Sequence, residues 1–350
     1  MPLTAKPSVA IILTGGTIGS VLTEDSTRAD KAGNALLQSR MEALTKNRIF
    51  DFHFHQLLAK DSGDFDMPDW HAVASEVDAQ IKLGCKRFLI THGTDTLPFT
   101  ATLLQILFGK RDVSIALAAA FFPLSDPRSD ATANITAAMA LLTQPDPRKG
   151  VFIPFRGTGR DVTLHHATNV QQMSADAGSF HSFYDAAVGV YKEGTGFQWG
   201  IEWASDKPQQ IETDFQIPTQ ESMVHAAKRV YFLAAYPGMN LAPYHALAAK
   251  ENILLVIRNY HSGTANASDV HGGVAEFIKR FPESLIVFAP LPAALIKKPY
   301  ESTLALMEMG AFIYRDLPPH KLYVLGVLGM ANGLQPRDAL LPAQPWLMNK

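Results

Sequence analysis

Two glycine-flanked segments place hydroxyl and carboxylate side chains directly after apolar runs. Residues 14–19 read TGGTIG and follow the apolar run 9–13, and residues 91–96 read THGTDT and follow the run 88–90. Glycine permits tight turns and lets backbone N–H groups approach a ligand closely. Three hydroxyls and a carboxylate within six residues are costly in a turn with only a structural role. The two segments are therefore the candidates for chemistry on a small polar molecule.

Each segment also has a purely structural interpretation. Residues 14–19 suit a glycine-rich turn that closes a strand, and Asp95 or Thr96 suits the N-cap of a helix that begins near Pro98. The first segment contains neither G-x-G-x-x-G nor G-x-x-x-x-G-K, so a nucleotide-phosphate site is not supported.

The surrounding pattern alternates short apolar runs with longer helical stretches, which predicts a mostly parallel sheet with helices on both faces. In such sheets ligands bind beyond the carboxyl ends of the strands, where both segments fall. The expected elements are strands at 9–13, 50–58, 87–91 and 113–122, and helices at 35–46, 68–83 and 98–108.

The whole chain is expected to form two α/β domains, the larger at the N-terminus. Residues 155–221 are irregular in pattern, and a second strand-helix series begins at Arg229. We assign residues 1–205 to the catalytic domain, 206–228 to a linker and 229–332 to the smaller domain. Residues 333–350, which contain three prolines, are expected to be a surface extension.

Composition narrows the class of function. The 31 Lys and Arg residues nearly balance 33 Asp and Glu residues, so no basic field is available for nucleic acid. No apolar run approaches the roughly 18 to 20 residues that cross a bilayer, and the run at 9–13 is too short for a signal peptide. The single cysteine, Cys85, excludes an intrachain disulfide and favours the cytoplasm.

Both segments are identical, letter for letter, to signatures of the asparaginase/glutaminase family, and the chain resembles that family to about Asn332. Other segments that carry the resemblance are 61–62 with 67–70, Ser129-Asp130 with Asn134, 159–163, 260–265 and 300–310.

The resemblance implies that Thr17 is the nucleophile of an acyl-enzyme and that Thr94 belongs to a Thr-Lys-Asp relay. It implies that Ser62 and Asp95 hold the carboxylate and the amine of the substrate, and that backbone N–H groups of the glycine loops bind the oxyanion. The expected catalytic residues are Thr17, Thr94 and Asp95, and the expected substrate-binding residues are Gly16, Asp61, Ser62 and Gly93.

Two positions depart from the family pattern. The relay lysine corresponds to Leu164, and the mobile-loop tyrosine has no counterpart between Gly19 and Asn34. Loss of a general base costs about 10²- to 10⁴-fold in rate. His165 or His166 could supply a base from the neighbouring positions, but on a strand His165 would face the opposite side and His166 would lie beyond the missing lysine. The alternative to a catalytic role for these histidines is a solvated polar pair.

Other possible sites are weaker. His53 and His55 alternate on a predicted strand, but no third metal ligand has suitable spacing, and no metal site is expected. Ser262 follows Tyr260-His261, yet the resemblance places that loop near the domain interface, where turn chemistry accounts for its residues.

The leading hypothesis is hydrolysis of the side-chain amide of asparagine, or of a related amide, to an acid and ammonia without a cofactor. A second hypothesis is an amidohydrolase with a different amide substrate, because Leu164 changes the site. A third is an amino-acid-binding protein with weak or no catalysis. The resemblance also implies a homodimer or homotetramer.

Overall fold

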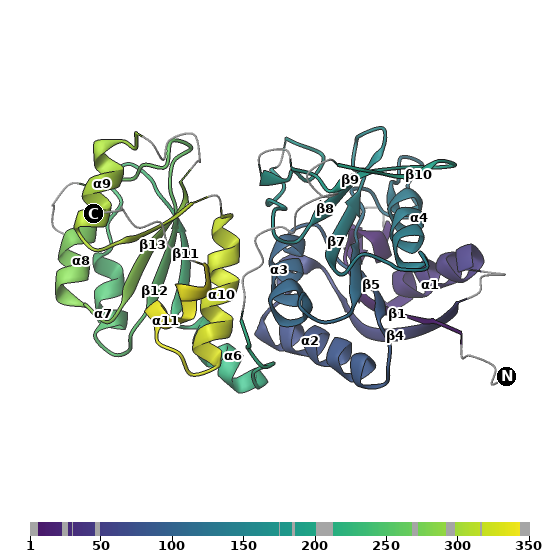
Figure 1. Ribbon diagram of the computed structural model, residues 1–350, viewed down its shortest axis with the longest axis horizontal. Helices are drawn as coiled ribbons and strands as arrows, with labels where there is room; N and C mark the ends of the chain where they lie inside the picture. The colour runs from purple at the N-terminus through teal and green to yellow at the C-terminus, as the bar shows by residue number, and fades with distance from the viewer. Residues whose placement is uncertain are drawn as a thin grey trace. The chain divides into compact units, whose positions relative to one another are not determined.

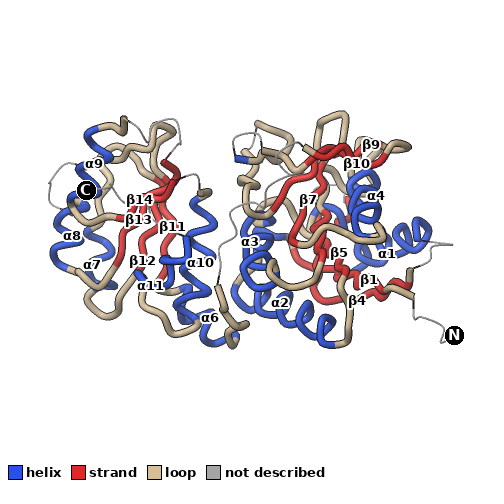
Figure 2. The backbone as a smooth tube through the Cα atoms, in the orientation of Figure 1, coloured by secondary structure: helices blue, strands red, loops and turns tan. Residues whose placement is uncertain are grey.

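A computed structural model describes residues 6–22, 27–29, 31–45, 50–174, 176–183, 186–200, 213–267, 272–291, 298–315 and 317–343. The chain divides into two compact units, residues 1–210 and 211–350. Each unit is built around its own sheet with helices against it (Figures 1 and 2).

The sheet of the first unit has the strand order β10-β9-β8-β7-β6-β5-β1-β4. Strands β4, β1, β5, β6 and β7 are parallel, whereas β8, β9 and β10 each run antiparallel to the preceding strand. The bounds are β1 Ser8–Gly15, β4 Asp51–Lys60, β5 Arg87–Thr91, β6 Ser114–Ala118, β7 Gly150–Phe155, β8 Val162–His166, β9 Gly189–Lys192 and β10 Gly196–Trp199. A separate hairpin pairs β2 Ser20–Leu22 with β3 Thr27–Ala29.

Helices cover both faces of this sheet. Side chains of α1 and α4 join Val9, Ile11 and Leu13 of β1 in one fully buried apolar cluster. The burial of this cluster stabilises the layer, since apolar side chains gain about 1.5–3 kcal/mol each on leaving water. The helices of this unit are α1 Lys31–Thr45, α2 Met67–Lys82, α3 Leu97–Phe108 and α4 Ala131–Leu142, and the short 3-10 turns near the strand ends are η1 Thr17–Gly19 and η2 Ser62–Asp64.

The predicted α/β class and parallel strands are confirmed, but the sheet extends further than the sequence indicated. Residues 155–221 contain β8, β9 and β10, which the sequence pattern did not predict. These strands have only four or five residues, and β9 and β10 each begin with a glycine, Gly189 and Gly196. Strands this short carry little periodic signal.

The second unit contains a parallel sheet in the order β11-β12-β13-β14. Its apolar core includes Ile257, Phe277, Phe288 and Leu306. The strands are β11 Val230–Ala234, β12 Leu254–Arg258, β13 Leu285–Leu291 and β14 Phe312–Arg315. The helical elements are α6 Gln220–Ala227, η4 Ala242–Tyr244, α7 His245–Ala248, α8 Val274–Arg280, α9 Glu301–Glu308, α10 Pro319–Ala331, α11 Pro336–Leu340 and η6 Leu341–Ala343.

Two stretches expected to lie outside the domains contribute to the second unit. Helix α6 falls within the predicted linker, but its Met223 and Ala226 are buried. Helix α11 follows α10, and its Ala339 and Leu340 are fully buried, so the surface-extension prediction was wrong for residues 336–340. Their apolar side chains pack inward, whereas the prolines of the segment had suggested an irregular surface chain. Residues 201–212 and 344–350 lie outside the described residues.

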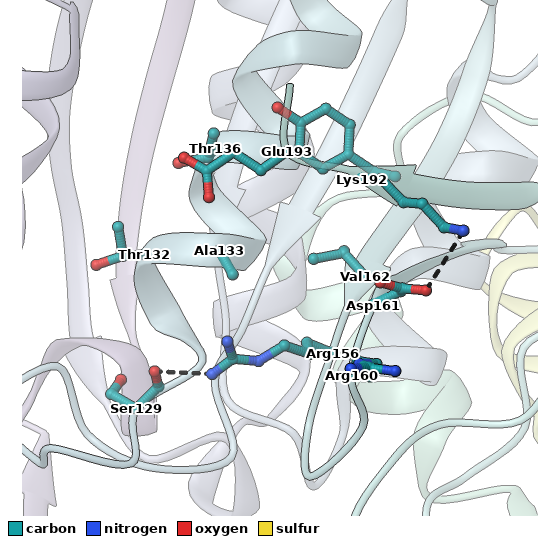
Figure 3. A pocket seen from close by; sticks show the side chains of 11 residues that line it. Ser129, Thr132, Ala133, Thr136, Arg156, Arg160, Asp161, Val162, Lys192 and Glu193 are labelled. Carbon is teal, nitrogen blue, oxygen red and sulfur yellow. Dashed lines mark hydrogen bonds and ion pairs between the residues drawn. The ribbon is translucent and has the colours of Figure 1, made fainter. Parts of the chain in front are cut away.

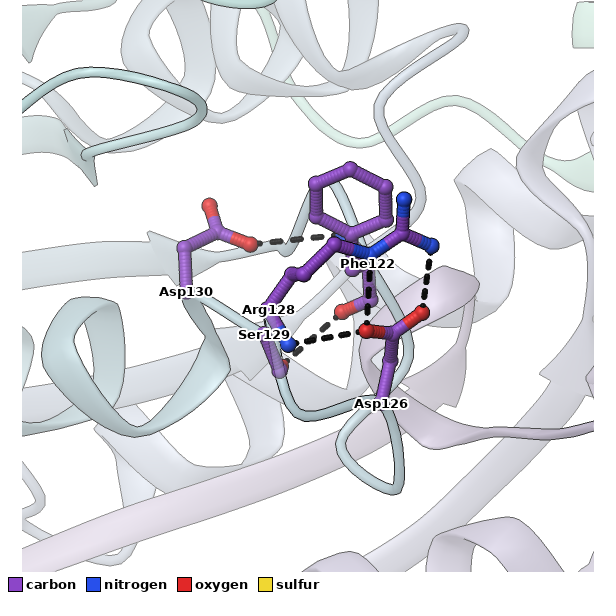
Figure 4. A network of polar contacts seen from close by, with 5 residues as sticks. All are labelled: Phe122, Asp126, Arg128, Ser129 and Asp130. Atoms are coloured by element: carbon purple, nitrogen blue, oxygen red, sulfur yellow. Dashed lines mark hydrogen bonds and ion pairs between the residues drawn. The ribbon is translucent and has the colours of Figure 1, made fainter.

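A buried carboxylate joins the loops that follow β6 and β7. Asp130 Oδ1 accepts hydrogen bonds from Phe121 N at 2.8 Å and Phe122 N at 3.4 Å, part of the network in Figure 4. Asp130 Oδ2 accepts from Asn134 Nδ2 at 2.9 Å and Gly157 N at 3.0 Å. Asp130 is fully buried, so these donors replace water around its carboxylate.

Asp130→Asn is expected to lower the free energy of unfolding by about 2 to 4 kcal/mol, because an amide nitrogen would face donors that need an acceptor. Asp126→Asn is the control, since Asp126 pairs with the side chain of the exposed Arg128. Urea denaturation measures both variants. Equal losses in the two would contradict a specific role for the buried carboxylate.

Candidate active site

The two glycine-flanked segments meet at the carboxyl ends of adjacent strands β1 and β5. Gly16 has a positive φ of 80°. A Cβ atom added to Gly16 would lie inside the van der Waals distance of Gly93 N and His92 C. Only glycine permits this approach of the two backbones, and the approach places Thr17 beside the segment that carries Thr94.

Hydrogen bonds fix the two segments to each other and to β4. Thr14 N donates to Thr91 Oγ1 at 3.0 Å, and Thr14 Oγ1 donates to the Thr91 carbonyl. Gly16 N donates to the Lys60 carbonyl at 2.9 Å. Ser20 Oγ donates to the Gly16 carbonyl, also at 2.9 Å. Hydroxyls of the first segment thus act in part as structural links.

Ser62 is brought to the same place from the end of β4. A Cβ atom on Gly93 would collide with Ser62 Oγ, and Thr96 Oγ1 donates to the Ser62 carbonyl at 2.8 Å. The side chain of Ser62 is 2% exposed, and its Oγ is buried without a hydrogen-bond partner. A buried hydroxyl without a partner is unfavourable unless a ligand completes it.

Asp95 points toward the Ser62 turn but is exposed to solvent. A Cβ atom on Gly63 would lie 3.6 Å from Asp95 Oδ2, and Gln172 Nε2 donates to the Asp95 carbonyl at 2.6 Å. Thr96 is the N-cap residue of α3, and no side-chain hydrogen bond caps this helix. The capping interpretation of Asp95 or Thr96 was therefore wrong, because Thr96 bonds Ser62 instead.

The expected site residues fall into a buried and an open set. Gly16, Ser62 and Gly93 are buried, Thr17 and Thr94 are partly buried, and Asp61 and Asp95 are exposed. Three loops therefore converge with hydroxyls, a carboxylate and close backbone N–H groups at one sheet edge. Their catalytic and binding roles remain predictions.

His92 is a residue of this region that sequence reasoning did not assign. Its ring is fully buried and lies 4.7 Å from the ring of Phe65. His92 Nδ1 lies 2.8 Å from the Gly93 carbonyl, which can only accept, so Nδ1 carries the proton. Burial lowers the pKa of His92 to about 4, and the imidazole is neutral at pH 7. The position of His92 within the THGTDT segment was the one feature of the sequence that could have indicated that it lies at the site.

Lys60 is the nearest lysine in sequence to these loops, but it is engaged elsewhere. Lys60 Nζ lies 2.7 Å from Asp69 Oδ2, and this hydrogen bond raises the pKa of Lys60. Asp69 also accepts from Asp66 N in the capping box of α2. A lysine held protonated by a carboxylate is not a replacement for the missing base.

Leu164 lies in the apolar core. It is fully buried on β8, opposite Pro154 of β7, and its cluster includes Ala118, Phe152 and Val188. A buried amine at this position would need a carboxylate or hydrogen-bond acceptors beside it, in place of these apolar side chains.

His165 and His166 are buried, so the solvated-pair interpretation was wrong. His165 Nδ1 lies 2.9 Å from Ser182 Oγ, and burial lowers its pKa to about 3. His166 accepts from Thr168 N and pairs with Phe152 near the amino end of β7. Thr163 pairs with Phe155 at the carboxyl end of β7, on the sheet edge that carries the glycine loops. His166 lies about 10 Å further along β8, toward the opposite edge.

His53 and His55 do alternate on β4, but His55 Nδ1 lies 3.0 Å from Glu76 Oε1. Within the described ranges no group of three or more His, Cys, Asp or Glu side chains is arranged to hold a metal ion. The same ranges contain no helix with the length and apolarity needed to cross a membrane.

The sequence that forms these loops lies within a match to a known family. The family model described as "Asparaginase, N-terminal" matches residues 8–202, which is more than half of the chain. The chain belongs to the asparaginase family and is an amidohydrolase.

Individual relatives agree with this assignment. A protein named probable periplasmic L-asparaginase, from Haemophilus influenzae, is 26% identical over 267 residues, which cover 75% of this chain and 72% of the relative. One subunit of the glutamyl-tRNA(Gln) amidotransferase from Pyrobaculum aerophilum is 24% identical over 355 residues, covering 95% of this chain and 78% of the relative. The thermostable L-asparaginase from Thermococcus kodakarensis has the same fold, with a TM-score of 0.75, 19% identity, and coverage of 96% and 97%.

Ser62→Ala is expected to separate binding from stability. Removing a buried hydroxyl without a partner leaves the free energy of unfolding unchanged or raises it by up to about 1 kcal/mol, while aspartate binds about 10-fold more weakly. Ser284→Ala is the control, since Ser284 Oγ accepts from Ile253 N at 3.0 Å and its loss costs about 1 kcal/mol. Urea denaturation and calorimetry measure the two effects, and clear destabilisation of Ser62→Ala would contradict the assignment.

Leu164→Lys is expected to destabilise the fold by about 3 kcal/mol or more without raising asparagine turnover, because the ammonium would be buried without a partner. Leu83→Lys is the matched control, since Leu83 is 80% exposed. Thermal unfolding and ammonia release are measured for both variants. A rise in kcat of about 10-fold at an unchanged melting temperature would show that the site lacks only the amine.

Proposed function

We propose that the chain hydrolyses the side-chain amide of asparagine, or of a closely related amide, through an acyl-enzyme on Thr17. The observation that carries the proposal is the convergence of Thr17, Ser62, Thr94 and Asp95 from three loops at one sheet edge. The names of the relatives support asparagine as the first substrate to test.

In the proposed reaction, Thr17 Oγ1 attacks the amide carbon and the carbonyl oxygen becomes an oxyanion. Backbone N–H groups of the two glycine loops stabilise that charge, other than the Gly16 N–H, which donates to the Lys60 carbonyl. The proton of the Thr17 hydroxyl is transferred to the amide nitrogen, the C–N bond breaks, ammonia leaves, and an ester joins the acyl group to Thr17. Water hydrolyses the ester, releases the acid and restores the Thr17 hydroxyl.

Substrate recognition follows from the chemistry of the loops. The exposed carboxylate of Asp95 suits the ammonium of an amino-acid substrate, and the unsatisfied Ser62 Oγ suits its carboxylate. Asp61 begins the turn that carries Ser62, and Thr96 holds that turn through its carbonyl. A small amino acid with one amide group fits this arrangement.

Proton transfer is where an alternative function arises. The packing of Leu164 in the apolar core and the burial of His165 and His166 away from the loops leave Thr94 without the family's amine. This observation favours two alternatives, an amidohydrolase with a different amide substrate and a weakly catalytic amino-acid-binding protein. Ammonia release from asparagine separates the leading function from both. Calorimetry with aspartate, compared between the wild type and Ser62→Ala, then separates a protein that binds aspartate at these loops from an enzyme for another amide.

We also propose a cytoplasmic homodimer or homotetramer that needs no cofactor. The single cysteine supports a reducing compartment, and family resemblance supports the assembly. Sedimentation of the purified chain tests the number of subunits.

Thr17→Ala is expected to lower amide hydrolysis at least about 1,000-fold and to change the melting temperature by no more than about 2 °C, because only the nucleophile is lost. Thr17→Ser should keep measurable activity, since it retains a hydroxyl. The matched control is Thr195→Ala, at an exposed position in the turn between β9 and β10. Ammonia release is the measurement, and unchanged turnover in Thr17→Ala would remove this residue from the nucleophile role.

A further inference from the structure

A polar cavity lies on the first unit, between α4 and the turn after β9. It has a volume of about 450 Å³ and is lined by charged and hydroxyl side chains (Figure 3). Cavities of this size hold small ligands. Val162 of β8 lines it, and β8 is three strands from β5 in the sheet, which is about 14 Å at the usual strand spacing. The residues that line it include none of the proposed catalytic set.

Arg156 is the fixed cation of this cavity. Its backbone N donates to Asn134 Oδ1 at 2.9 Å, and its Nη2 donates to the Ser129 carbonyl at 3.0 Å. Its Nε is buried and has no hydrogen-bond partner, and within the described part of the chain no carboxylate pairs with its guanidinium. A guanidinium held in place with an unused buried donor is suited to a carboxylate or another planar anion.

The remaining charges define the ligand further. Lys192 Nζ lies 3.9 Å from Asp161 Oδ2, so these two charges largely offset each other. Arg156, Arg160 and Glu193 then leave the cavity with two positive groups and one negative group. A complementary ligand carries two negative groups and one positive group, and Thr132 and Thr136 add hydroxyls on the α4 side.

We propose that this cavity, the Arg156 pocket, binds a dicarboxylic α-amino acid. The two carboxylates bind Arg156 and Arg160, and the ammonium binds Glu193. The pocket does not depend on the proposed amide hydrolysis, because its residues and that machinery are separate. If aspartate is the product of the chain, the same molecule occupies both places.

The test is calorimetric titration of the full chain with L-aspartate, succinate and inorganic phosphate. Asp95→Ala weakens the proposed catalytic site, and that variant is expected to bind one aspartate per chain in the Arg156 pocket. Adding Arg160→Ala to it should weaken aspartate binding about 10-fold or more, as loss of a charged hydrogen-bonding partner does. Arg40→Gln, at an exposed position of α1, is the matched control and should leave binding unchanged.

The ammonium contact has its own variant. Glu193 is exposed, so Glu193→Gln should fold normally, weaken L-aspartate binding and leave succinate binding unchanged. Absence of binding in Asp95→Ala, equal affinity after Arg160→Ala, or phosphate binding as tightly as aspartate would each overturn the proposal. If the wild-type chain releases no ammonia from asparagine while Asp95→Ala still binds aspartate, only the proposed function is overturned.

Discussion

The approach of two backbones at Gly16 and Gly93 is the constraint on which the site depends. Side chains on either residue would push the loops apart, and a Cβ on Gly93 would also displace Ser62. Because β1 lies between β4 and β5, this single contact lets residues from three strand ends meet. The hydroxyl-bearing loops are therefore positioned by backbone packing rather than by their own polar contacts alone.

A second constraint holds the neighbouring loops. The carboxylate of Asp130 accepts hydrogen bonds from the segments after β6 and β7. Asn134, which also donates to Asp130, accepts a hydrogen bond from Arg156 N. His92 N donates to the Ala118 carbonyl at 2.9 Å, so the glycine loop after β5 is also tied to the end of β6. The glycine loops and the Arg156 pocket thus lie at the ends of neighbouring strands of one sheet.

The sequence predicted the elements whose pattern is long and periodic. The parallel strands and helices of both units follow from apolar runs that must be buried on two faces. The strands after β7 could not be seen in this way, since each has only four or five residues and runs antiparallel to the strand before it. The helix at Pro336 was hidden because proline suits both a loop and the first turn of a helix.

For the site, motifs predicted which residues matter but not their environment. The meeting of Gly16, Gly93 and Ser62 depends on strand order, and no local pattern encodes it. Nor does a local pattern distinguish a buried histidine from a solvated one, as His165 and His166 demonstrate. Burial is a property of the packed molecule, so only the fold could place Lys60 against Asp69 or leave Ser62 Oγ without a partner.

Binding geometry and proton transfer are physically separable in this fold. Among the described residues, the hydrogen bonds that hold the glycine loops and the Ser62 turn involve β1, β2, β4, β5, β6, Gln172 and the start of α3, and none involves β8. A change on β8 can therefore replace an amine by an apolar side chain without moving the groups that would recognise an amino acid. Leu164 gains burial in the core, while the loops keep their close contact. It follows that binding of an amino acid is the property least affected by this change, and that the rate of amide cleavage is the property that reveals what replaced the lysine.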